Sequence, residues 1–125
     1  MNKSNIGVII VCVVVVASVV MLSGADTQPA VDRSSFAQCL ARTGAVMYGA
    51  EWCSHCADQK KMFGDAFSYV PYVECPDDPE KCVALGIEGY PTWTIGSSTR
   101  LVGTQSLERL SQVSGCPITL EKEPQ

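Results

Sequence analysis

The sequence predicts one small α/β domain that follows an apolar N-terminal helix. Three observations support this prediction: the chain has only 125 residues, Ile6 to Leu22 holds no charged residue, and the remainder alternates helix-like with strand-like segments. About a hundred residues remain after the apolar stretch, which is enough for one domain. We expect a signal-anchor or signal peptide at 1–25, a linker at 26–33, the domain at 34–117 and a flexible tail at 118–125.

The apolar stretch predicts a membrane-crossing helix. Ile6 to Leu22 would form roughly 25 Å of helix, which is just sufficient for a bilayer core. Lys3 precedes the stretch, so the amino terminus should stay in the cytoplasm and the domain should lie on the extracytoplasmic side. Ser23-Gly24-Ala25 is typical of a signal-peptide cleavage site, and cleavage would leave a secreted or periplasmic domain. The length of the run favours the retained anchor, within which Cys12 is a small apolar residue.

Composition narrows the function classes. The formal net charge is −4 and no basic patch stands out, which argues against a nucleic-acid partner. Seven cysteines in so short a chain indicate an oxidising compartment, where disulfides persist.

After the linker, helix and strand patterns follow one another. Ser34 or Ser35 is expected to cap the first helix, and the helix that begins at Cys53 should expose Asp58, Lys60, Lys61 and Asp65 to solvent. The expected helices are 35–43, 53–67, 79–86 and 106–114, and the expected strands are 45–49, 69–74, 92–95 and 99–102.

The segment Trp52-Cys53-Ser54-His55-Cys56 carries the strongest chemical signal. Its cysteines are one helical turn apart at the start of a predicted helix, where free backbone N–H groups and the helix dipole favour a thiolate. Such a pair makes and breaks disulfides, with Cys53 as the attacking sulfur and Cys56 as the resolving one. Half of a zinc site is the alternative, but His55 is the only histidine and no second pair with this spacing exists. We therefore expect neither a metal nor a cofactor.

The blocks around this motif resemble the thioredoxin superfamily. The narrower resemblance is to the thioredoxin-like domain that is fused or partnered to bacterial vitamin K epoxide reductase homologues, and it covers most of 36–116. The blocks that carry it are Met47–Ala50, Trp52–Gly64, Pro71–Cys75 and Gly86–Trp93. The resemblance implies a thioredoxin-like fold, with a central mixed sheet flanked by helices, and a vitamin K epoxide reductase-like membrane partner.

The resemblance also implies roles for residues around the cysteines. Pro91 should be cis and should pack against the pair, while the backbone of Tyr90 should bind a substrate peptide. Trp52 is either a substrate-facing aromatic residue or a packing residue, and Trp93 has the same two interpretations. His55 should stabilise the thiolate, as in strongly oxidising periplasmic oxidases, unless it is an uninvolved imidazole.

One position departs from the superfamily. Thioredoxins keep a buried acid six residues before the first cysteine, where this chain has Met47. A methionine cannot accept the proton that Cys56 must lose. Water or Glu51 is then the expected acceptor, or fast reduction of substrates is not the main activity.

Four cysteines remain outside the apolar stretch and the motif, and they allow three pairings. We favour Cys75–Cys82, since the similar domains carry a cysteine pair after this strand and the short loop would stabilise by roughly 2–3 kcal/mol. We favour Cys39–Cys116 as a link between the first and last helices. A second redox pair at Cys75–Cys82 is the functional alternative.

The resulting expectation is a membrane-anchored extracytoplasmic thiol–disulfide oxidoreductase. It would form disulfides in secreted proteins and be reoxidised by the membrane partner. A disulfide reductase or isomerase is one alternative, and a non-catalytic thioredoxin-like binding module is another.

Overall fold

The computed structural model describes residues 2–22 and 30–121, with side chains described at 2, 5–15 and 30–121. The N-terminal stretch forms helix α1 (Lys3–Leu22). Among the described residues, no helix has both the length and the apolar character that a membrane crossing requires. The cleavage-like Ser23-Gly24-Ala25 and most of the expected linker lie outside the described residues.

The domain is built on a four-stranded mixed sheet with the order β2-β1-β3-β4. β1 pairs in parallel with β2 and antiparallel with β3, and β3 and β4 form a hairpin. The elements of the domain are α2 (Arg33–Arg42), β1 (Val46–Gly49), α3 (Ser54–Phe63), the 3-10 helix η1 (Gly64–Tyr69), β2 (Tyr72–Glu74), α4 (Pro79–Ala84), β3 (Thr92–Ile95), β4 (Thr99–Val102) and α5 (Leu107–Ser114).

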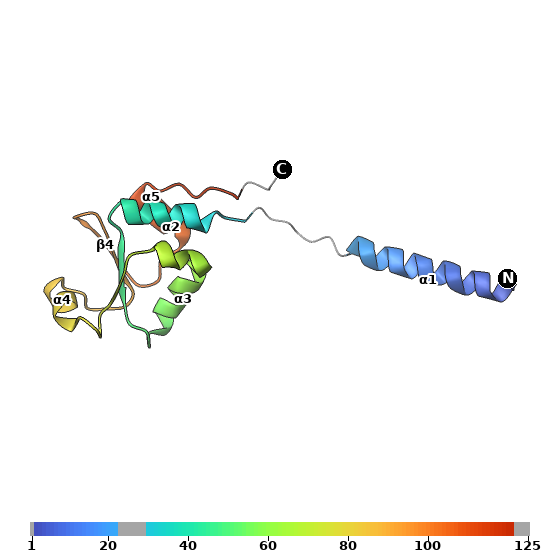
Figure 1. Cartoon of the computed structure of the whole chain (residues 1–125), viewed down its shortest axis with the longest axis horizontal. Helices are drawn as coiled ribbons and strands as arrows, with labels where there is room; N and C mark the ends of the chain where they lie inside the picture. The colour runs from blue at the N-terminus through green and yellow to red at the C-terminus, as the bar shows by residue number, and fades with distance from the viewer. Residues whose placement is uncertain (1, 23–29, 122–125) are drawn as a thin grey trace.

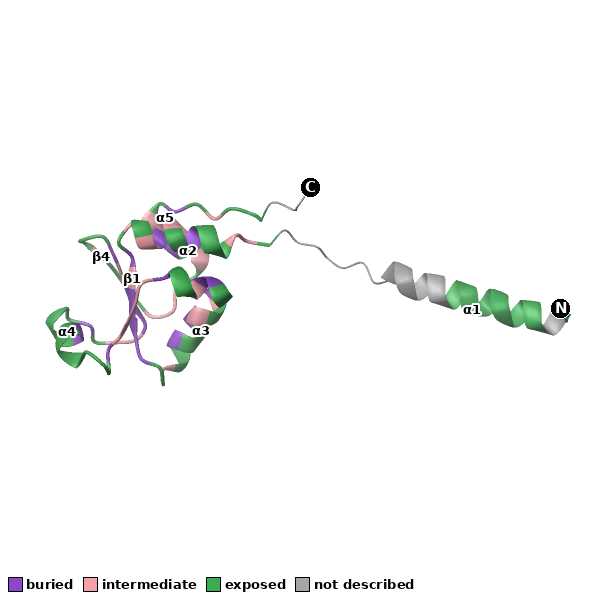
Figure 2. Cartoon of the chain, viewed as in Figure 1, coloured by how far each residue is buried: buried purple, intermediate pink, exposed green. Residues whose placement is uncertain are grey.

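Each face of β1 belongs to a different apolar cluster. Met47 packs into the larger cluster, to which α2, α3, η1 and α5 contribute, whereas Tyr48 packs into a smaller one with Cys75, Cys82 and Ile87. Successive side chains of a strand point to opposite faces, so the two clusters lie on opposite sides of the sheet. Figure 1 accordingly shows α3 and α4 on opposite sides of the strands. Figure 2 shows the buried residues gathered around β1, while α4 is largely exposed.

Two expected helix boundaries were wrong. Asp32, rather than Ser34 or Ser35, caps α2, because its carboxylate accepts a hydrogen bond from the Ser35 amide at 2.9 Å. α3 ends at Phe63 instead of continuing to Phe67, since Gly64 adopts a positive φ of 58° and the chain tightens into η1.

Residues 118–121, expected as part of a flexible tail at 118–125, are tied to the rest of the domain, while 122–125 lie outside the described residues. Leu120 bridges Val31, the Asp32 amide donates to the Thr119 carbonyl at 2.8 Å, and Ile118 packs against the larger cluster. The sequence offered no sign of this pairing because both partner segments are too short to show strand periodicity. Residues 118–121 therefore belong to the domain.

Two disulfides close the domain, and they are the two pairs that the sequence analysis favoured. Cys39 of α2 bonds to Cys116 after α5, across 77 positions of the sequence. Cys75 and Cys82 join the end of β2 to α4, across 7 positions. All four of these residues are half-buried or buried.

Removing the long-range disulfide should cost more stability than removing the short one. The chain-entropy relation gives about 4.5 kcal/mol for the loop that Cys39–Cys116 closes and about 2.4 kcal/mol for the loop that Cys75–Cys82 closes. Denaturant unfolding of the full chain with either pair replaced by alanine measures both losses. A larger loss for the short loop would contradict the expectation.

Candidate active site

The Cys53–Cys56 pair lies where β1 gives way to α3. Cys53 is the N-cap residue of α3 and has extended backbone angles, and the Cys56 amide donates a hydrogen bond to its sulfur at 3.4 Å. Cys53 is half-buried, Cys56 is 1% exposed, and both are free thiols. The more accessible sulfur thus lies at the helix tip, with the second sulfur one turn further in.

The loop before β3 meets this tip. The Tyr90–Pro91 peptide bond is cis, as the resemblance implied, and Pro91 is buried. The Cys53 thiol contacts the Tyr90 carbonyl oxygen at 3.7 Å in a weak hydrogen bond. The backbone that precedes the cis proline therefore lies directly beside the Cys53 sulfur.

Two aromatic side chains flank the thiol at the surface. Trp52 is 75% exposed, and its ring meets the edge of Tyr90 with the centroids 6.0 Å apart. An exposed tryptophan beside a half-buried tyrosine is suited to contact with a polypeptide. Trp93 differs, because it is fully buried with its ring centre 6.0 Å from that of Phe63, so it is a packing residue.

Cys56 is surrounded tightly by the sheet. A Cβ atom placed on Gly49 would lie 2.8 Å from the Cys56 sulfur, which is closer than real Cβ contacts come, so the site requires glycine there. The pKa of the Cys56 thiol is raised to about 11, chiefly by burial, and its hydrogen bond with Cys53 acts in the same direction. The backbone at Ala50 and the positive charge of Lys60 act in the opposite direction.

The other predicted site residues lie around the pair. His55 is exposed in the first turn of α3, and its carbonyl accepts a hydrogen bond from the Thr104 hydroxyl at 3.2 Å. Its role at the thiolate stays a prediction. Met47 is fully buried, and Glu51 is exposed. Within 2–22 and 30–121, no cluster of histidine, cysteine or carboxylate side chains is arranged to hold a metal ion.

Sequence analysis missed two polar residues near the site, Gln59 and Glu74. Gln59 is fully buried, and its side-chain carbonyl accepts from the Trp93 indole at 3.1 Å and from the Gln105 amide at 2.7 Å. Glu74 accepts hydrogen bonds from the Tyr72 hydroxyl at 2.5 Å and from the Glu51 amide at 2.7 Å. No sequence pattern pointed to these contacts, most of which join segments far apart in the sequence.

The expected solvated face of α3 also needs a correction. Lys60 is half-buried, and its ammonium lies 4.0 Å from the centre of the Tyr72 ring. A cation over an aromatic face is stabilised by the ring's electrons. This lysine therefore belongs to the surroundings of Cys56 rather than to an ordinary wet surface.

The second disulfide is shielded from solvent. Cys75 is 1% exposed and Cys82 is 2% exposed, and both belong to the smaller apolar cluster. A relay of electrons through this pair would need access that the structure does not give, so the geometry favours the structural interpretation.

The class of the protein follows from the way the cis proline meets the cysteine pair over a mixed sheet: the chain has a thioredoxin-like α/β fold that carries a free dithiol. The chain is similar to the curated Thiol-disulfide oxidoreductase LTO1 of Arabidopsis thaliana, at 46% identity over 81 residues. This similarity covers 58% of the chain and only 21% of LTO1, so the chain spans about a fifth of that relative. No family model matches the chain.

Solved structures with a similar arrangement include three thioredoxins. Chloroplastic thioredoxin z is 18% identical with a TM-score of 0.48, and the match covers 57% of this chain and 74% of that one. The oxidised thioredoxin of Plasmodium falciparum is 19% identical (TM-score 0.45, 66% and 88% covered). Mitochondrial thioredoxin 3 of Saccharomyces cerevisiae is 16% identical (TM-score 0.41, 58% and 74% covered). At these identities and scores, no conclusion about this chain rests on them.

In the reduced chain, the Cys56 thiol should titrate near pH 11 because burial disfavours its thiolate. Since its pKa is raised in the folded state, its contribution to stability is present below the pKa of an unfolded cysteine and is lost as the pH rises through about 11. NMR titration of the Cys56 side chain measures the pKa directly, and Cys56→Ser is the control for the loss of stability. Titration of Cys56 near neutral pH would contradict the expectation.

Proposed function

We propose that the chain is a thiol–disulfide oxidoreductase that exchanges its Cys53–Cys56 dithiol with protein thiols and disulfides. The observation that carries the proposal is the position of Cys53, which is half-buried at the tip of α3 and 3.7 Å from the Tyr90 carbonyl, with Cys56 buried one turn behind it. The similarity to LTO1 over the same part of the chain supports the same chemistry.

The exchange proceeds through a mixed disulfide. When the pair is oxidised, a substrate thiolate attacks the Cys53 sulfur, the Cys53–Cys56 bond breaks, and Cys56 leaves as a thiolate that takes up a proton. A second substrate thiolate then attacks the substrate sulfur of the mixed disulfide, which leaves a substrate disulfide and the reduced pair. Trp52 and Tyr90 offer the surface on which the substrate chain lies.

We further propose that the enzyme works as an oxidase, forming disulfides in secreted proteins. An imidazole in the first turn, at His55, can stabilise the Cys53 thiolate, and this stabilises the reduced form and makes the pair more oxidising. The two closed structural disulfides suit an oxidising compartment. The resemblance to domains that accompany vitamin K epoxide reductase homologues supports a membrane protein of that kind as the reoxidising partner.

Anchoring through α1, with the domain on the extracytoplasmic side, completes the proposal. Its support is the 20-residue helix Lys3–Leu22, whose sequence is free of charge from Ile6 onward, and the lysine that precedes this run. Release of the chain from a membrane fraction by detergent but not by salt tests the anchor, and a mature chain that begins after Ala25 would instead indicate a cleaved signal.

Trapping should identify the substrates. A Cys56→Ser variant of the full chain lacks the resolving thiol, so mixed disulfides on Cys53 should accumulate and appear as adducts by mass spectrometry. The matched Cys53→Ser variant should trap none. Equal trapping by both variants, or full activity in cells after Cys53→Ala, would favour the non-catalytic binding module.

The reduction potential separates an oxidase from a reductase or isomerase. We expect a value nearer to that of DsbA, about −120 mV, than to that of thioredoxin, about −270 mV. Equilibration of the full chain with glutathione buffers measures it. His55→Ala should shift the potential toward more reducing values, and a wild-type value close to thioredoxin's would overturn the proposed direction.

A further inference from the structure

The two cysteines alone do not provide a group that accepts the proton of Cys56. In the step that closes the Cys53–Cys56 disulfide, Cys56 attacks the mixed disulfide on Cys53, and it must first lose its proton. Burial raises the pKa of this thiol to about 11, so little thiolate is present at neutral pH without a base. Met47, which stands where thioredoxins keep an acid, is fully buried and accepts no proton.

Strand β2 carries two polar side chains, Tyr72 and Glu74, beside the part of β1 that contacts Cys56. β2 pairs in parallel with β1, with Met47 opposite Tyr72 and Gly49 opposite Glu74. Side chains two residues apart on a strand share a face, so Tyr72 and Glu74 lie on the face that carries Met47. Lys60 of α3 covers the Tyr72 ring, which places this face against the redox helix.

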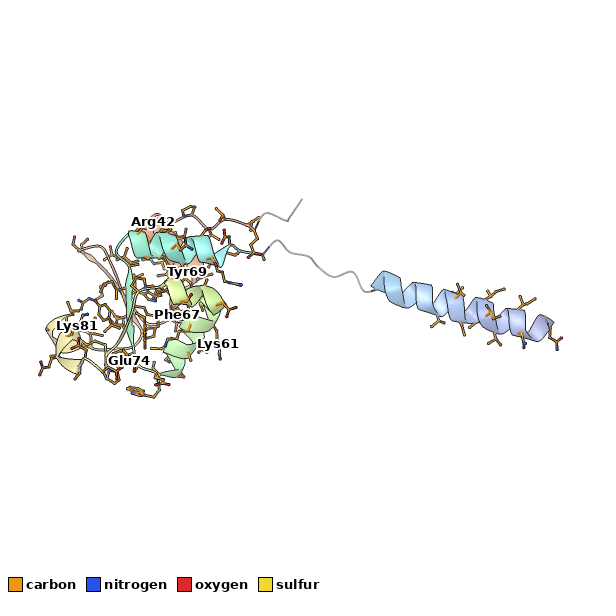
Figure 3. All side chains as sticks on the ribbon, viewed as in Figure 1. Arg42, Lys61, Phe67, Tyr69, Glu74 and Lys81 are labelled. Carbon is orange, nitrogen blue, oxygen red and sulfur yellow. A yellow bond between two sulfur atoms is a disulfide. The ribbon has the colours of Figure 1, made fainter. Side chains whose placement is uncertain are left out.

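Hydrogen bonds fix the Glu74 carboxylate at this edge. One oxygen accepts from the Tyr72 hydroxyl at 2.5 Å, and the other accepts from the amide of Glu51, two residues before Cys53, at 2.7 Å. Glu74 is half-buried, and Figure 3 shows it at the same end of the domain as the N-terminus of α3. The carboxylate is thus tied to both the strand and the active-site turn.

Because Gly49 has no side chain, a small space is left that both the Cys56 sulfur and the Tyr72 hydroxyl border. A Cβ atom on Gly49 would lie 2.8 Å from the Cys56 sulfur and 3.1 Å from the Tyr72 hydroxyl oxygen. Sulfur and hydroxyl therefore border the same small space, and they are no further apart than the sum of these distances. A direct hydrogen bond or one bridging water spans such a gap.

We propose that Glu74, acting through the Tyr72 hydroxyl, takes the proton that Cys56 sheds as it attacks the mixed disulfide on Cys53. The Cys56 proton passes to the tyrosine oxygen while the tyrosine proton passes to the carboxylate. The new Cys53–Cys56 bond forms, the bond from Cys53 to the substrate breaks, and the substrate leaves as a thiolate. In the opposite direction the same groups return the proton to Cys56. This assignment rests on the proposed oxidoreductase function.

The surrounding charges suit this relay. Burial and the hydrogen bond to Glu74 raise the pKa of Tyr72, so its hydroxyl stays protonated and passes a proton on without forming a stable tyrosinate. Lys60 is the nearby cation, and its charge favours the Cys56 thiolate. Glu51, which the sequence analysis named beside water as a possible acceptor, has an exposed side chain, and its backbone amide instead orients Glu74.

Ellman's reagent separates the two thiol steps. The full chain in detergent carries Cys12→Ala, because Cys12 is a further free cysteine, and is reduced mildly so that both structural disulfides stay closed. Attack by Cys53 releases one chromophore in a step that depends on reagent concentration. Attack by Cys56 releases a second chromophore in a step that does not. Stopped-flow absorbance follows both.

Glu74→Gln and Tyr72→Phe should slow the second release by about 10- to 100-fold at neutral pH and leave the first unchanged, since general bases contribute at about this level or above. In both variants the second rate should rise with pH toward the titration of Cys56, and added acetate should partly restore it in Glu74→Gln. Glu51→Gln is the matched control and should match the wild type. Thermal unfolding checks that the variants are folded.

The outcomes distinguish this relay from the function on which it rests. An unchanged second step in both variants, a slow step in Glu51→Gln alone, or equal slowing of both steps would overturn the relay. The oxidoreductase proposal would survive each of these results. It would fail only if the wild-type chain released no second chromophore.

Discussion

The close approach of the Cys56 sulfur to Gly49 is the contact on which the rest of the site depends. A strand residue normally projects a Cβ toward the helix that packs on it, and here that atom would lie 2.8 Å from the sulfur. Its absence lets the first turn of α3 settle against the end of β1. With the helix seated there, Cys53 becomes the N-cap and reaches the Tyr90 carbonyl. The absence of a side chain at Gly49 therefore allows both thiols to take their positions.

Strong local patterns predicted the frame of this site. The cysteine spacing after an apolar strand located the tip of α3, whereas the loop of Tyr90 and Pro91 that faces it was expected only from the resemblance to the thioredoxin superfamily. Turn and cap residues near Asp78, Ser106 and Gly115 also behaved as local chemistry predicts. Such features depend on neighbours within four residues, which a sequence displays directly.

The remaining features depend on contacts between distant segments. Gln59 resembles any polar residue of a surface helix until β3 and the segment before α5 surround it. Val31 and Leu120 pair where Cys39–Cys116 and the packing of Ile118 hold the two ends of the domain together. Lys60 is drawn from solvent by the Tyr72 ring, which lies on another element. The hydrophobic periodicity of the sequence contains no information about these contacts between distant segments.

A methionine at position 47, in place of the buried acid of thioredoxins, avoids the free-energy cost of burying a charge. An ionised carboxylate inside the larger cluster would lose its hydration with little to replace it, whereas a methionine packs there without such a penalty. Glu74 stands on the edge strand β2, half-buried, with two donors and access to water. A tyrosine hydroxyl can pass the Cys56 proton out to that edge without a carboxylate in the core. The relay would thus let the sheet keep an apolar interior beside Cys56 while a base stays within reach of its sulfur.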